Sequence, residues 1–173
     1  MKKLTLALIL LCAAAIMSAQ KSGDKIAFSA KNLEGEQITD SIFENNKLTM
    51  LNIWGTFCPP CIKEMPDLAR LNEANKARGV EVVGIVIDIA DRSGNVLAKQ
   101  KKDADTIIAG TGADYEHIVP SPAMMAGFLR GVQAVPSTIF VDQSGKMVGE
   151  MYLGARSQKD WQKIIDDILA GRE

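Results

Sequence analysis

A β-favouring apolar run leads directly into two closely spaced cysteines, and this junction constrains the fold more than any other feature. Residues 47–54 read KLTMLNIW, which is typical of a buried strand. From Pro59 the apolar residues recur at helical spacing to about Arg78, and Gly79 then ends the helix. Cys58 is therefore expected at the N-terminus of a helix, where the chain leaves the sheet.

This position favours the thiolate form of Cys58, because the sulfur faces backbone N–H groups and the positive end of the helix dipole. Cys61 is expected one helical turn further on, close enough for a disulfide and more deeply placed. Pro59 and Pro60 fit the first helical turn, where N–H groups lack intrahelical partners. Because the prolines also remove two donors, we expect a moderately depressed Cys58 pKa. The redox couple should then be reducing, nearer to roughly −270 mV than to roughly −120 mV.

Glu64 follows Cys61 by three places, which puts both residues on one helical face. A carboxylate there raises the pKa of the Cys61 thiol and can accept its proton when Cys61 attacks. The alternative is a solvated helix glutamate without a catalytic role. Pro66, inside the same helical pattern, is expected to kink the helix.

The other apolar runs predict further strands and helices in a single domain, with no repeat or linker between them. Strands are expected at residues 25–30, 37–38, 80–88 and within 115–119, and in a hairpin around the turn at 143–145; helices are expected at 95–109, 122–132 and 158–170. Parallel strands linked by helices, together with an antiparallel hairpin, indicate an α/β fold. We expect a central mixed β-sheet flanked by helices on both faces.

Residues 1–19 have the layout of a secretory signal peptide, with a basic start at Lys2 and Lys3, an apolar middle and small residues at the end. We expect cleavage after Ala19, which leaves residues 20–173 as the folded domain. An uncleaved signal that acts as a membrane anchor is the alternative, although the apolar middle is short for a spanning helix.

Charge and cysteine content narrow the function classes further. The chain has 20 basic and 21 acidic side chains, so it offers no basic field for nucleic acid and no polybasic membrane patch. Of the three cysteines, Cys12 lies in the signal peptide, so only Cys58 and Cys61 remain after export to an oxidising compartment. Two cysteines this close together indicate a functional motif, since a disulfide-stapled fold has more pairs, further apart.

Two segments carry a family resemblance. WGTFCPPCIKEMPDL, residues 54–68, resembles the active-site segment of the TlpA/ResA-like thiol–disulfide oxidoreductases of the thioredoxin superfamily. GVQAVPSTIFVDQSG, residues 131–145, resembles their cis-proline segment and the hairpin after it. The resemblance covers roughly residues 24–170 and implies a thioredoxin-like fold with an N-terminal strand extension and an inserted helical segment. The chain departs from the pattern at Asn52, where cytoplasmic thioredoxins carry a buried aspartate, and at Phe57, which replaces the commoner tryptophan.

The resemblance assigns roles to individual residues. Cys58 matches the attacking cysteine, Cys61 the resolving cysteine and Glu64 the buried glutamate of this branch. Pro136 matches the cis-proline opposite the cysteine pair, and the backbone of Val135 would pair with an extended substrate segment. The expected substrate contacts are Trp54, Phe57, Pro59, Val135 and Pro136. No metal or cofactor is expected.

The same resemblance implies a place and partners for the protein. It predicts a disulfide reductase of the bacterial periplasm or of the outer face of the cytoplasmic membrane. Its substrates would be disulfides of extracytoplasmic proteins, including the Cys-x-x-Cys-His segments of apocytochrome c during cytochrome c maturation. An integral-membrane thiol carrier would supply electrons, and the protein is expected to be a monomer.

Three alternatives remain open at this stage. A thiol-dependent peroxidase needs a lone reactive cysteine with threonine three residues before it, and position 55 is Gly. A copper-binding or copper-delivery module could use the cysteine pair together with His117, in the predicted short strand. A purely structural disulfide is the third alternative. It is weak because bridging residues three apart closes a small loop and constrains the unfolded chain little.

Overall fold

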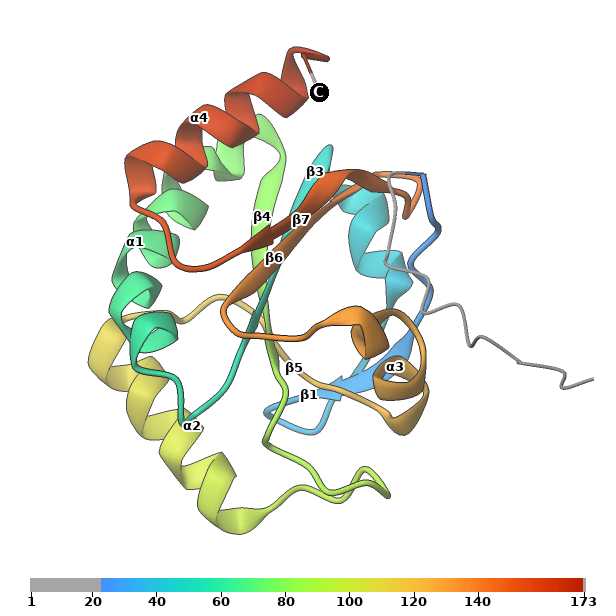
Figure 1. Cartoon of the computed structure of the whole chain (residues 1–173), viewed down its shortest axis with the longest axis vertical. Coiled ribbons are helices and arrows are strands. Elements are labelled where there is room, and N and C mark those ends of the chain that lie inside the picture. Colours follow the sequence, from blue (N-terminus) through green and yellow to red (C-terminus); the bar gives the residue numbers. More distant parts are fainter. Residues whose placement is uncertain (1–22, 173) are drawn as a thin grey trace, which may run out of the picture.

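Seven strands form the central sheet of the computed structural model, which describes residues 23–172. The predicted signal peptide and Cys12 lie outside the described residues. The strands are β1 (Ser29–Asn32), β2 (Gln37–Thr39), β3 (Leu48–Trp54), β4 (Val80–Val86), β5 (His117–Val119), β6 (Ser137–Asp142) and β7 (Met147–Leu153). Their order across the sheet is β2-β1-β5-β4-β3-β6-β7 (Figure 1).

The sheet is mixed, as the order of the apolar runs predicts. β3, β4 and β5 are parallel to one another in the centre, and β6 and β1 flank them in antiparallel orientation. All seven residues of β3 are buried, because this strand lies between β4 and β6 and both of its faces are covered.

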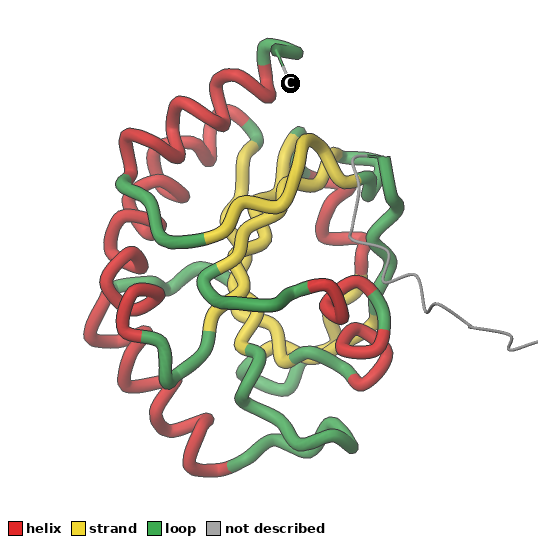
Figure 2. Tube along the Cα trace, viewed as in Figure 1, coloured by secondary structure: helices red, strands yellow, loops and turns green. Residues whose placement is uncertain are grey.

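The helices divide between the two faces of the sheet (Figure 2). One face carries α1 (Pro59–Asn75), α2 (Ala98–Thr111) and α4 (Gln158–Leu169). The other carries α3 (Pro122–Ala126) and the short 3₁₀ segments η1 (Asp40–Asn45) and η3 (Phe128–Gly131). A third 3₁₀ segment, η2 (Lys76–Arg78), extends α1 and ends at Gly79, whose φ of 77° is left-handed.

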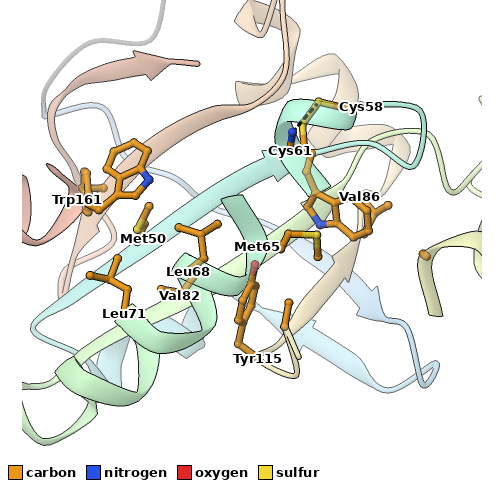
Figure 3. Close-up of a cluster of buried hydrophobic side chains, with 14 of the residues drawn as sticks. Met50, Cys58, Cys61, Met65, Leu68, Leu71, Val82, Val86, Tyr115 and Trp161 are labelled. Atoms are coloured by element: carbon orange, nitrogen blue, oxygen red, sulfur yellow. Dashed lines mark hydrogen bonds between the residues drawn. A yellow bond between two sulfur atoms is a disulfide. The ribbon is translucent and has the colours of Figure 1, made fainter. Parts of the chain in front are cut away.

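Side chains along the central strands alternate between two apolar cores. Met50 and Trp54 of β3 lie in the core that α1, α2 and α4 cover. Leu51 and Ile53 lie in the core beneath α3, η1 and η3. Cys58 and Cys61 stand at the start of α1, and α1 covers this face of the sheet. Both cysteines therefore pack against this first core (Figure 3).

Several element boundaries differ from the prediction. The strand expected at 25–30 begins only at Ser29, and Lys25 makes one isolated bridge. The helix expected from residue 95 begins at Ala98, because the Asp91 side chain accepts hydrogen bonds from the backbone of Ser93 and Asn95 and holds a turn there. The helix expected at 122–132 is divided into α3 and η3.

No helix in residues 23–172 has both the length and the apolar character needed to cross a membrane.

Candidate active site

The two cysteines lie at the start of α1, where a disulfide joins them with their Cα atoms 5.3 Å apart. Cys58 is the N-cap residue, and Pro59 and Pro60 occupy the first two helical positions. The backbone N–H of Cys61 donates a hydrogen bond to Cys58 Sγ, with an N–S distance of 3.3 Å. This donor and the helix dipole favour a thiolate on Cys58 once the disulfide is reduced.

The two cysteines differ in their exposure to solvent. Cys58 keeps 4% of its surface exposed, whereas Cys61 is 0% exposed and packs with Met65 in the first core. Phe57 is 65% exposed and Pro59 is also exposed, so both present surface next to Cys58. The small exposed surface that Cys58 has and Cys61 lacks suits Cys58 to attack and Cys61 to resolve.

The loop between β3 and α1 is held by Asp88, which follows the end of β4. Asp88 Oδ1 accepts a hydrogen bond from the Thr56 backbone N–H at 3.0 Å, and Asp88 Oδ2 accepts one from the Thr56 hydroxyl at 2.5 Å. Thr56 lies two residues before Cys58, so these two hydrogen bonds fix the backbone that leads to the reactive cysteine. No local motif in the sequence marked Asp88.

Replacing Asp88 with alanine is expected to lower the free energy of unfolding by about 2 kcal/mol, because two hydrogen bonds to a charged acceptor are lost. Asp88→Asn should retain most of this stability, since its amide can accept from the Thr56 N–H and donate to the Thr56 hydroxyl. Urea unfolding of the oxidised variants measures both values. Equal losses in the two variants would contradict the assigned role of these bonds.

Glu64 lies one turn after Cys61 and is only 4% exposed, so the alternative of a solvated helix glutamate is wrong. Asn52 Nδ2 donates to Glu64 Oε1 at 3.0 Å, and the Arg156 backbone N–H donates to Glu64 Oε2 at 3.0 Å. Burial raises the pKa of the Glu64 carboxyl, and these donors only partly oppose it. A buried carboxyl with a raised pKa, on the same helical face as Cys61, is suited to take a proton from that thiol.

The Val135–Pro136 peptide bond is cis, as the resemblance implies. Ile53 of β3 pairs with Ser137 of β6, so Pro136 lies at the end of the sheet from which the loop to Cys58 departs. Val135 is half-buried and packs against both cores. Its pairing with a substrate backbone stays a prediction.

Trp54 presents no surface to a protein substrate. Its side chain is 0% exposed, and its indole N–H donates to His117 Nδ1 at 3.2 Å. The expected substrate contact at Trp54 is therefore not supported, and its place in the core gives it a different role. Phe57 and Pro59 remain candidates for substrate contact, because both are exposed beside Cys58.

Arg156, in the loop between β7 and α4, belongs to the site although no sequence motif indicated it. Its backbone N–H donates to the Glu64 carboxylate. Its guanidinium lies 4.9 Å from the ring centroid of Trp161 and 5.2 Å from that of Tyr152. A groove of about 480 Å³ between this loop and the start of α1 is lined by Pro60, Glu64 and Arg156, among others. The groove gives the buried carboxyl a route to solvent.

His117 does not offer the free imidazole that a copper site would need. It is buried in β5, and both ring nitrogens are engaged, one with the Trp54 indole and the other with the carbonyl oxygen of Ala113. Across residues 23–172, no group of three or more histidine, cysteine, aspartate or glutamate side chains is placed to hold a metal ion. The geometry therefore gives the copper alternative no support.

Comparison with known proteins places the chain in a family. A family model described as the AhpC/TSA family matches residues 23–150. The chain belongs to this family. It is 30% identical over 141 residues to the thiol-disulfide oxidoreductase ResA of Bacillus thuringiensis subsp. konkukian, a match that covers 82% of this chain and 74% of the relative. It is therefore also a member of the ResA-like group.

Two further similarities agree with this membership. The thiol:disulfide interchange protein HelX of Rhodobacter capsulatus is 29% identical over 134 residues, which are 77% of this chain and 67% of the relative. A crystal structure of a thioredoxin-family thiol:disulfide interchange protein from Chlorobium tepidum TLS superposes with a TM-score of 0.69. That match covers 86% of this chain and 97% of the other at 22% identity, and it shows that the fold is thioredoxin-like.

Proposed function

We propose that this protein is an extracytoplasmic thiol–disulfide oxidoreductase that reduces disulfides in other envelope proteins. The observation that carries the proposal is the pairing of Cys58, which keeps a small exposed surface at a helix N-terminus, with a fully buried Cys61 one turn behind it. The ResA-like relatives support the reaction class, since they are named for thiol–disulfide chemistry.

The reaction proceeds in two exchange steps. The Cys58 thiolate attacks one sulfur of a substrate disulfide, forms a mixed disulfide and releases one substrate thiolate. Cys61 gives up its proton to Glu64 and attacks the Cys58 sulfur, which releases the second substrate thiolate. Two electrons pass to the substrate, and the protein is left with the Cys58–Cys61 disulfide. A membrane thiol carrier then returns two electrons to restore the dithiol.

The finer assignments follow from the resemblance to TlpA/ResA-like proteins. We place the protein in the periplasm or at the outer face of the cytoplasmic membrane, reached through a signal peptide at residues 1–19. Apocytochrome c, with its Cys-x-x-Cys-His segments, is the proposed substrate class. Phe57, Pro59 and Val135 are the proposed contacts for an extended substrate segment, and the buried Pro136 would hold the Val135 backbone in place for this pairing.

The purified protein should reduce insulin with dithiothreitol as electron donor. Its potential against a glutathione series should lie closer to the reducing end of the known range, roughly −270 mV, than to the oxidising end. Insulin that stays intact would overturn the exchange reaction. A potential near the oxidising end of the range, roughly −120 mV, would overturn the direction of electron flow and leave the exchange chemistry in place. Consumption of peroxide by the protein would instead support the thiol-dependent peroxidase.

A further inference from the structure

A glycine in the middle of the sheet allows side chains from its two neighbouring strands to meet. Gly84 in β4 pairs with His117 in β5 on one side and with Asn52 in β3 on the other. Trp54, two residues after Asn52, therefore lies on the same face as His117. A Cβ atom at position 84 would lie 2.1 Å from His117 Nδ1 and 3.1 Å from Trp54 Nε1. The Trp54–His117 pair thus occupies the space that any larger residue at position 84 would need.

The hydrogen bonds of this pair fix the tautomer of His117. The Trp54 indole can only donate, so His117 Nδ1, at 3.2 Å, must be the unprotonated acceptor. The ring proton is then on Nε2, which donates to the carbonyl oxygen of Ala113 at 2.8 Å. Both nitrogens are satisfied only in the neutral form. Burial lowers the pKa of His117 to about 4, so the ring stays neutral at neutral pH.

Trp54 connects this pair to the cysteines. It is the last residue of β3 and lies in the same buried cluster as Cys58, Cys61 and Met65. Its carbonyl oxygen also accepts a hydrogen bond from the Ile87 backbone N–H at 2.9 Å, which fixes the end of the strand. The orientation of the indole therefore helps to define the packed layer on which the first turn of α1 rests.

We propose that His117 is a positioning residue for the redox pair. It accepts the Trp54 hydrogen bond across Gly84 and so fixes the indole ring within the buried cluster that contains Cys58 and Cys61. An indole N–H that is bonded to His117 is not available as a donor to another group. Stabilisation of the Cys58 thiolate is then left to the helix N-terminus, including the Cys61 N–H. The inference rests on the proposed thiol–disulfide exchange for its functional readout.

Three variants separate this role from general packing. His117→Leu removes the acceptor at similar volume, and His117→Gln restores one, because its Oε1 can accept from the indole. Tyr115→Phe is the matched control. The Tyr115 ring centroid lies 4.7 Å from that of His117, and within residues 23–172 its buried hydroxyl has no hydrogen-bond partner, so the substitution alters the same environment without touching the Trp54 bond.

The measurements use the protein purified after export by a bacterial host. NMR gives the hydrogen-exchange rate of the Trp54 indole N–H, and titration against glutathione gives the equilibrium constant between dithiol and disulfide. His117→Leu should accelerate indole exchange at least tenfold and shift the equilibrium constant at least threefold. His117→Gln should recover most of both effects, and Tyr115→Phe should leave both within twofold of the wild type.

An equilibrium constant that is unchanged in His117→Leu, or shifted equally by Tyr115→Phe, overturns the inference. If His117→Leu does not fold, ¹⁵N shifts of the wild-type imidazole decide the question. A proton on Nε2 and a protected Trp54 indole in both redox states support the inference, and a proton on Nδ1 in either state overturns it. Failure of the wild type to reduce insulin would count against the proposed function instead, so the two failures are distinguishable.

Discussion

A Cys61→Ser variant is expected to accumulate mixed disulfides with its substrates, and a Cys58→Ser variant is not. Cys58 retains some exposed surface, and its sulfur accepts a hydrogen bond from the backbone N–H of residue 61, which a serine at that position keeps. The Cys58 thiolate can therefore still attack in the Cys61→Ser variant. A serine hydroxyl cannot displace the captured sulfur, so the mixed disulfide persists. Catalysed turnover should fall to the level of the uncatalysed exchange in both variants. Non-reducing electrophoresis of the cell envelope, followed by release of the adducts with dithiothreitol, measures the trapping.

The control is a set of variants that all carry Cys12→Ala, so that Cys58 and Cys61 are the only cysteines able to form adducts. Equal trapping by the two single variants would contradict the assignment of attacker and resolver. In Cys61→Ser, the Cys58 thiol should also react with iodoacetamide at lower pH than free cysteine does, because the helix N-terminus lowers its pKa. A titration midpoint like that of free cysteine would contradict the role given to the helix.

The parts of the site governed by local rules could be predicted from the sequence. Prolines at the first helical turn, cysteines three residues apart and a glutamate three residues later fix the arrangement of one helix end, whatever the rest of the chain does. The buried run of β3 also depends on local composition. These rules placed Cys58, Cys61 and Glu64 correctly relative to one another, and the resemblance added the cis bond at Pro136.

The other members of the site depend on long-range pairing, which no local pattern encodes. Arg156 meets Glu64 across 92 positions of sequence, and only the turn after β7 decides which backbone N–H faces the carboxyl. The Trp54–His117 hydrogen bond requires the strand register that sets Gly84 opposite His117. A glycine in a strand sequence does not indicate which side chains will pack over it. Burial of Trp54 follows from the same pairing, so a local pattern that marks a conspicuous aromatic residue beside the cysteines does not show whether it faces solvent or the core.

Glu64→Gln is expected to slow the release of the mixed disulfide near neutral pH by about tenfold or more, because an amide cannot take the Cys61 proton. One of the two hydrogen bonds that orient the side chain is kept, since the Gln oxygen can accept from either Asn52 Nδ2 or the Arg156 N–H. Attack by Cys58 should be little affected. Stopped-flow measurement of mixed-disulfide formation and decay separates the two steps, and unchanged decay would remove Glu64 from the mechanism.

The same substitution should change how stability depends on pH. Burial raises the pKa of Glu64 above its ordinary value of 4.5, so the folded protein keeps this proton to higher pH than the unfolded chain does. The stabilisation from this group is complete below pH 4.5 and is lost as the pH rises through the folded-state pKa. Glutamine does not titrate, so the oxidised Glu64→Gln protein should gain stability relative to the wild type as the pH rises through this window. Glu73→Gln, at an exposed position of the same helix, controls for the loss of one negative charge. If urea unfolding gave the same pH trend for both variants, burial would not be what raises the pKa of Glu64 in the folded protein.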